Sequence, residues 1–131
     1  MKRVTGIGGV FLKAKDPKAL QAWYRDHLGF DLESWGGAIF KWHTPERPEP
    51  DGLTVWCLFP EASDHFAPST APVMVNYRVE NLAALLDALR SEGCDVDPKT
   101  SDSEEGKFGW VMDPEGNRVE LWEPPKAAGL G

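Results

Sequence analysis

The sequence is poor in the residues that several common kinds of site require. It has two cysteines, Cys57 and Cys94, which lie far apart and form no Cys-x-x-Cys pair. We therefore expect two buried, reduced thiols, not a disulfide or a cysteine-ligated metal. No Gly-x-Gly-x-x-Gly precedes a helix, and no serine elbow is present. These absences argue against a nucleotide-binding loop and against a serine hydrolase.

Positive charge and long apolar runs are also scarce. The 14 lysines and arginines are outnumbered by 21 aspartates and glutamates, which gives a net charge of −7. An acidic chain repels phosphate backbones, so we do not expect a nucleic-acid partner. The apolar runs are too short to span a bilayer, and residues 1–15 lack a secretory apolar region. We expect a cytoplasmic protein without a membrane partner.

What the chain does contain suits one compact domain over residues 1–131. Its length fits a single domain, and 41% of its residues are hydrophobic. Six tryptophans add large contact surfaces.

One pattern occurs twice along the chain. Residues 7–14 and 73–79 alternate as strands do, and each is followed by a helix start, at Asp16-Pro17 and at Asn81. Gly29 and Gly93 then stop the two helices. The apolar helix stripes are Leu20, Trp23, Tyr24 and Leu28 in the first half, and Leu82, Leu85, Leu86 and Leu89 in the second.

Short strands are expected after each helix. The first half offers Phe30–Ser34, Ala38–His43 and Leu53–Phe59, and the second offers Cys94–Asp97, Phe108–Met112 and Arg118–Trp122. Turn residues (Asp51-Gly52 and "DPEGN") support the last hairpins, and residues 44–52, 60–72 and 101–107 are expected loops. The pattern predicts an α+β fold of two βαβββ modules, at 1–60 and 73–123. A linker at 61–72 joins them, and a tail follows at 124–131.

Two small sheets, each covered by one helix on one face, must bury their other faces, and a cleft between them would do so. Alternation puts Val55, Cys57 and Phe59 toward the helix. The predicted ligand-binding residues of the cleft are Phe11, Thr54, Trp56, Met74, Asn76, Trp110, Arg118, Glu120 and Trp122. Aromatic walls with a few polar groups are typical of a site for a small organic molecule. A solvated sheet face or a partner interface is the alternative.

Three stretches are spread over nearly the whole chain: "GIGGVFLKAKDPKALQAWYRDHLGF", "VNYRVENLAALLDALRSEG" and "GKFGWVMDPEGNRVELWEP". In these stretches the chain resembles the vicinal oxygen chelate superfamily, which includes glyoxalase I, bleomycin-resistance proteins and extradiol dioxygenases. The resemblance implies paired βαβββ modules in a U-shaped mixed sheet around a cleft. It also implies that the metal-ligand positions fall on Gly9, Trp56, Met74 and Glu120. Of these four residues, only Glu120 has a side chain that binds a hard metal ion, so we expect no metal and no cofactor. A relocated site using His43 or His65 with Glu120 is the alternative.

Three functions remain open at this point. The first is a metal-free protein of the glyoxalase/bleomycin-resistance type that binds a small organic molecule, with acidic charge suited to a cationic ligand. The second is an enzyme, a lyase or isomerase with Glu120 as catalytic base or a metal enzyme with rearranged ligands. The third is an interaction module. On the shared strand face, Arg118 would pair with Glu120 and keep it ionised. The resemblance also implies a homodimer.

Overall fold

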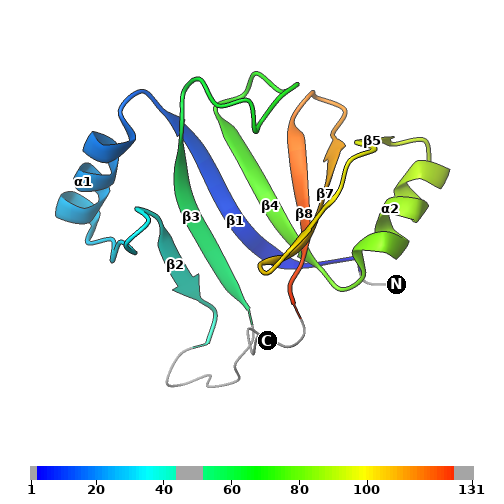
Figure 1. Ribbon diagram of the computed structural model, residues 1–131, viewed down its shortest axis with the longest axis horizontal. Helices are drawn as coiled ribbons and strands as arrows, with labels where there is room; N and C mark the ends of the chain where they lie inside the picture. Colours follow the sequence, from blue (N-terminus) through cyan, green and yellow to red (C-terminus); the bar gives the residue numbers. More distant parts are fainter. Residues whose placement is uncertain (1–2, 44–51, 126–131) are drawn as a thin grey trace.

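The protein is one mixed β-sheet with a helix at each end. The computed structural model describes residues 3–43 and 52–125, and it confirms the predicted α+β class (Figure 1). The elements are β1 (Val4–Ala14), α1 (Pro17–Leu28), β2 (Ala38–Lys41), β3 (Leu53–Pro60), β4 (Val73–Val79), α2 (Leu82–Ser91), β5 (Asp95–Val96), β6 (Ser101–Ser103), β7 (Gly106–Met112) and β8 (Arg118–Glu123).

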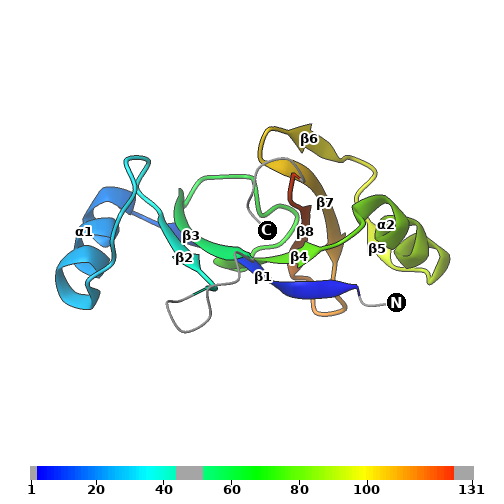
Figure 2. The same ribbon diagram turned by 90° about the horizontal axis from the view of Figure 1, so that it is seen from below.

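The two halves of the sheet meet at a central pair of strands. The order is β2-β3-β1-β4-β8-β7-β5, with β6 added to β7. β1 pairs with β4 antiparallel, whereas β3 joins β1 and β8 joins β4 in parallel. Figure 2 shows β3 and β7 rising on opposite sides of β1 and β4. The inner faces of the two halves therefore look toward one another.

The helix boundaries follow the predicted signals. The Asp16 and Asn81 side chains accept hydrogen bonds from the backbone N–H of Ala19 and Ala84, each at 3.1 Å. Each helix ends near a glycine with positive φ, Gly29 at 68° and Gly93 at 82°. These positions satisfy backbone groups that a helix end would otherwise leave unpaired.

The core divides into two clusters of different kinds. The first lies under α2 and consists of Val79, Leu82, Leu85, Leu86 and Leu121. The second consists of Phe11, Phe66 and Met74, with Val55, Cys57, Phe59 and Trp110 packed against it. α1 buries none of its residues fully, and its main aromatic contact places the Tyr24 ring 4.7 Å from that of Trp56.

Three local predictions were wrong. Residues 30–34 form no strand, because the Phe30 ring packs on Tyr24 and Trp56 and the backbone turns between Glu33 and Gly37. Part of the expected loop 101–107 forms β6, which pairs with β7. Cys94 is exposed, although both thiols were expected to be buried.

Residues 44–51, most of the predicted loop 44–52, lie outside the described residues, and the module boundaries at 60 and 73 stay a prediction. Within the described segments, neither helix has the length and apolar character needed to cross a bilayer.

Candidate functional site

A cavity of about 580 Å³ lies between the two halves of the sheet. Its walls come from β1, β3, β4, β7, β8, the segment between β3 and β4, and the region around β6. Six of its members are aromatic or branched apolar residues: Phe11, Val55, Phe59, Phe108, Trp110 and Trp122. The remaining wall consists of Gly8, Cys57, His65, Asn76, Ser101, Glu105 and Glu120. The cavity is built within one chain.

Glu120 is the deeply buried charged group of this cavity, with 3% of its surface exposed. Strand register explains its surroundings, because Asn76 on β4 and Trp110 on β7 are the residues directly opposite Glu120 on β8. Asn76 Nδ2 donates to Glu120 Oε1 at 2.7 Å, and Trp110 Nε1 donates to Oε2 at 2.9 Å. Both oxygens of Glu120 therefore accept hydrogen bonds from neighbouring strands.

His65, in the segment between β3 and β4, contacts the same carboxylate. Its Nε2 lies 3.0 Å from Glu120 Oε2, and its side chain is 34% exposed, against 4% for that of Glu120. The imidazole stacks on the Phe59 ring at 5.1 Å with an angle of 4° between the planes. It meets the Trp110 ring edge-on at 6.3 Å. His65 is therefore the accessible member of the pair.

Cys57 also lines the cavity, and its thiol is a weak acid there. Burial raises the pKa of the Cys57 thiol to about 11, and the negative charge of Glu120 adds to the effect. Both causes disfavour the thiolate, which is the nucleophilic and metal-binding form. Cys57 is thus an uncharged part of the wall at neutral pH.

The residues present do not fit the divalent metal of the superfamily. The four positions onto which the resemblance maps the superfamily's ligands hold Gly9, Trp56, Met74 and Glu120, of which only glutamate binds a hard cation. Within residues 3–43 and 52–125, no three His, Cys, Asp or Glu side chains come together as a metal would need. His65 reaches Glu120, as the relocated site required, but it brings no third ligand.

Five of the nine predicted cleft residues line the cavity, and four do not. Phe11, Asn76, Trp110, Glu120 and Trp122 line it. Met74 lies beneath it, 1% exposed, in the cluster with Phe11 and Phe66. Placing Thr54 and Trp56 in the cleft was wrong. Thr54 bonds to Trp42 Nε1 and to the Ile7 carbonyl, and Trp56 packs on Tyr24.

The error on β3 has a physical cause. The strand carries large apolar side chains on both faces, so alternation alone cannot say which face meets the helix. Val55, Cys57 and Phe59 line the cavity, although they were assigned to the helix side.

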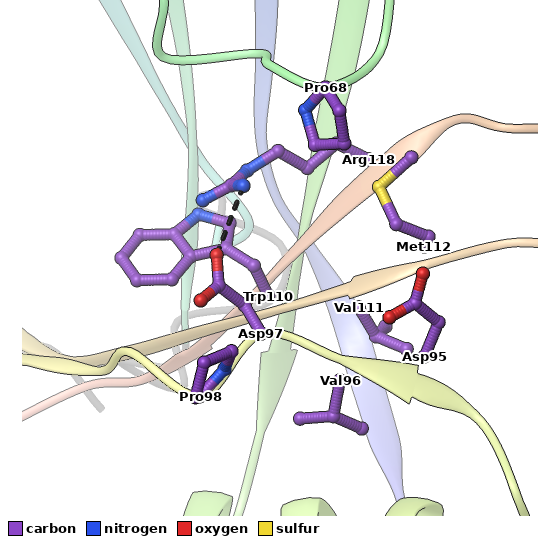
Figure 3. A pocket seen from close by; sticks show the side chains of 9 residues that line it. All are labelled: Pro68, Asp95, Val96, Asp97, Pro98, Trp110, Val111, Met112 and Arg118. Atoms are coloured by element: carbon purple, nitrogen blue, oxygen red, sulfur yellow. Dashed lines mark hydrogen bonds and ion pairs between the residues drawn. The ribbon is translucent and has the colours of Figure 1, made fainter.

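Arg118 lies in a second, smaller cavity of about 240 Å³, behind Trp110 (Figure 3). Its Nη1 donates to Asp97 Oδ2 at 3.2 Å and to the Ala67 carbonyl at 2.7 Å. The guanidinium lies 4.9 Å from the centre of the Trp110 ring. The predicted pairing of Arg118 with Glu120 is therefore wrong, because Asp97 and Ala67 take the guanidinium instead.

Two residues that line the cavity, His65 and Gly8, were not predicted from the sequence to lie there. His65 lies in a loop, and loop side chains have no periodicity that could assign them to a face. Gly8 lies where the β1–β4 register shifts between Ile7 and Gly9. A Cβ atom at Gly8 would meet Asn76 Oδ1 and the Trp122 ring, so glycine allows the close packing next to Glu120.

Comparison with known proteins agrees with this fold. Residues 9–122 match the family model described as a glyoxalase-like domain. The chain therefore belongs to the glyoxalase-like domain family, within the vicinal oxygen chelate superfamily. No curated protein sequence matches it significantly.

Solved structures show the same fold at low sequence identity. Methylmalonyl-CoA epimerase from Mycobacterium tuberculosis is 22% identical, with a TM-score of 0.66, over 95% of this chain and 92% of that chain. A methylmalonyl-CoA epimerase in complex with methylmalonyl-CoA and NH4+ is 16% identical, with a TM-score of 0.68, over 94% and 96%. A glyoxalase/bleomycin resistance protein/dioxygenase superfamily member from Vibrio splendidus 12B01 is 12% identical, with a TM-score of 0.56, over 89% and 97%.

Proposed function

We propose that this protein binds a small organic molecule with an apolar body in the cavity between the two halves of the sheet, without a metal. One observation carries the proposal: the aromatic and aliphatic wall has a buried carboxylate, Glu120, with fixed partners. A volume of about 580 Å³ falls within the range of small-molecule sites. An apolar wall offers water few favourable contacts, whereas burial against it lowers the free energy of an apolar ligand.

The charges around the cavity favour a neutral or cationic ligand. Among the described residues that line it, Glu105 and Glu120 are acidic, and no lysine or arginine is present. The net charge of −7 acts in the same direction. A coenzyme A ester carries several phosphate charges, so the proposal does not extend to the ligand of the similar epimerase structure. Cationic aromatic compounds fit the wall and the charge together.

Proton-transfer chemistry of the lyase or isomerase type is a second candidate. It is favoured by one specific observation, the contact of His65 Nε2 with Glu120 Oε2 at 3.0 Å. A histidine fixed by a buried carboxylate is a common arrangement for general acid–base catalysis.

The cavity has a built-in reporter of occupancy, the Cys57 thiol. We would screen neutral aromatic compounds, arylalkylamines and coenzyme A esters by melting temperature. Each compound that binds is then tested for slowing of Cys57 alkylation by iodoacetamide, followed by mass spectrometry. The exposed Cys94 in the same molecule is the internal control, because a cavity ligand leaves its alkylation rate unchanged.

Two variants of β3 separate binding in the cavity from binding elsewhere. Val55→Phe fills part of the cavity, whereas Leu58→Phe adds a ring to a β3 residue outside the cavity lining. We expect neutral or cationic compounds to stabilise the wild type and Leu58→Phe, and to lose their effect in Val55→Phe. If no compound of the panel protects Cys57, or if Val55→Phe binds as the wild type does, the proposed function is wrong.

A further inference from the structure

We propose that His65 is the proton acceptor of this site and that Glu120 is the buried residue that positions it. The inference rests on the proposed function, since it assigns a chemical role to one wall of the same cavity. It moves the role of base from Glu120, where the sequence placed it, to a histidine in the segment between β3 and β4. It also defines the ligand, which must present an acidic O–H, N–H or C–H group to the imidazole.

Glu120 is poorly placed to act on a ligand directly. Its Oε1 accepts from Asn76, and its Oε2 is shared by Trp110 and His65. Only 4% of its side-chain surface is exposed. A ligand would have to displace one of these partners to reach the carboxylate, and each partner would then lose a buried hydrogen bond. The His65 side chain, which is 34% exposed, is far more accessible to a ligand than the carboxylate it contacts.

The contact with Glu120 fixes which nitrogen of His65 carries the proton. Both Glu120 oxygens already accept from Asn76 and Trp110, and a carboxylate only accepts hydrogen bonds, so the proposal assigns the donor role in this contact to Nε2. In the neutral imidazole the lone pair then lies on Nδ1. Nδ1 makes no hydrogen bond to any side chain or backbone group of the described residues. The ring therefore has one nitrogen held by the protein and one nitrogen left for a ligand.

The ring is also held in orientation. Phe59 stacks on one face of the imidazole and the Trp110 ring meets it edge-on, so rotation of the imidazole would break both contacts. Trp110 donates to the same Glu120 oxygen that His65 contacts, which couples the position of the carboxylate to that of the ring. A base that is fixed before the ligand arrives needs little reorganisation in the transition state.

The step is a transfer of one proton and needs no further reactant. A ligand O–H, N–H or C–H group gives its proton to Nδ1, and the bonding electron pair stays on the ligand. The imidazolium that forms keeps its Nε2–H bond to Glu120, whose negative charge stabilises it. The total charge of the site is unchanged. Return of the proton to the same atom or to a neighbouring atom of the ligand completes the cycle.

The first test needs no ligand. We would label the histidine imidazoles with ¹⁵N and record the nitrogen shifts at pH 8 by NMR, with His65→Gln to assign the signal. The expected result is a protonated Nε2 and an unprotonated Nδ1 at His65, and loss of this preference in Glu120→Gln. A proton on Nδ1, or the same spectrum in Glu120→Gln, would overturn the assignment, and circular dichroism of the variant confirms that it is folded.

The second test uses 4-nitrophenol, whose absorption changes when it loses its proton. In the wild type we expect the bound probe to show a phenolate-to-phenol ratio about tenfold above that of the free probe at the same pH, the equivalent of one pKa unit. His65→Gln should remove this difference while still binding the probe. The control is His27→Gln on α1, which changes a histidine outside the cavity lining and should behave as the wild type.

The outcomes separate this inference from the proposed function. If ligands protect Cys57 but bound 4-nitrophenol stays protonated, the cavity binds molecules and His65 is not its proton acceptor. If His65→Gln still produces phenolate, another group takes the proton and the inference is wrong. If nothing protects Cys57, the proposed function fails, whatever the tautomer of His65 proves to be.

Discussion

At the residue scale, Glu120 shows how one buried carboxylate organises four segments of the chain. Its partners come from β4, β7 and the segment between β3 and β4, and each would lose its acceptor together with the carboxylate. A buried charge is tolerated only when it is compensated in this way. The carboxylate is therefore part of the structure as well as of the candidate site.

Removing Glu120 should be costly to stability. We expect Glu120→Ala to lower the free energy of unfolding by about 3 kcal/mol, because it leaves the buried donor of Asn76 and the partly buried donor of Trp110 without an acceptor. Glu120→Gln keeps one acceptor oxygen and should lose about half as much. Urea unfolding followed by tryptophan fluorescence measures both. A Glu120→Ala variant as stable as the wild type would contradict the role of this network.

The raised pKa of the Cys57 thiol predicts how its alkylation rate depends on pH. Burial and the charge of Glu120 disfavour the thiolate and raise the pKa to about 11, so the reactive form grows as the pH rises toward that value. The alkylation rate of Cys57 should increase about tenfold per pH unit between pH 7 and 10. Mass spectrometry after timed iodoacetamide treatment gives the rate. A plateau below pH 9 in the folded protein would show that the thiol is not shielded.

At the scale of elements, the two helices depend on the sheet to different degrees. α2 buries Leu82, Leu85 and Leu86, whereas α1 buries no residue fully. Leu86→Ala should therefore cost about 3 kcal/mol of unfolding free energy, through lost burial and a cavity. Leu28→Ala, at a position that is 58% exposed on α1 in the single chain, is the matched control and should change the stability of the monomer by less than about 0.5 kcal/mol. Equal losses in urea unfolding would contradict this difference.

The elements also show what could be predicted from the sequence. Asp16, Gly29 and Asn81 determine helix ends through local backbone chemistry, and all three occupy the predicted cap positions. β3 could not be oriented, because Trp56 and Val55 are both apolar and only the tertiary packing decides between their faces. Glu120, Asn76 and Trp110 were found from alternation since each is on a strand with a polar or aromatic face. His65 was not, because its position depends on a loop.

At the scale of the whole molecule, the cavity exists because β1 and β4 join two similar halves into one curved sheet. The chain reaches this arrangement with few buried polar groups. Ser69, Asn76 and Glu120 are the buried polar residues of the described segments, and two of the three lie at the cavity. Buried polar groups in a largely apolar interior cost stability, and such a cost is tolerated mainly at functional sites. The concentration of these groups at the cavity is therefore typical of a functional site.

Exposed apolar side chains in the first half of the chain favour a homodimer. Five large apolar side chains between residues 23 and 40 are exposed on α1, the following connection and the edge strand β2: Trp23, Leu28, Trp35, Ile39 and Phe40. Trp23, Leu28 and Trp35 are about half exposed, at 49%, 58% and 54%. Exposed aromatic and large apolar side chains so close together in the sequence are typical of protein interfaces.

Charge variants on this surface test the dimer. We expect the wild type to sediment as a dimer at micromolar concentration in about 0.15 M salt, which screens the repulsion between two acidic chains. Trp35→Glu combined with Phe40→Glu should shift the protein to monomer, because two charges would be buried in the contact. Val73→Glu, at a 40% exposed position on β4, is the control and should remain dimeric. A monomeric wild type would refute the dimer, and a double variant that still pairs would move the contact to another surface. Since all the residues that line the cavity belong to one chain, ligands should still protect Cys57 in the monomeric variant, which separates assembly from binding.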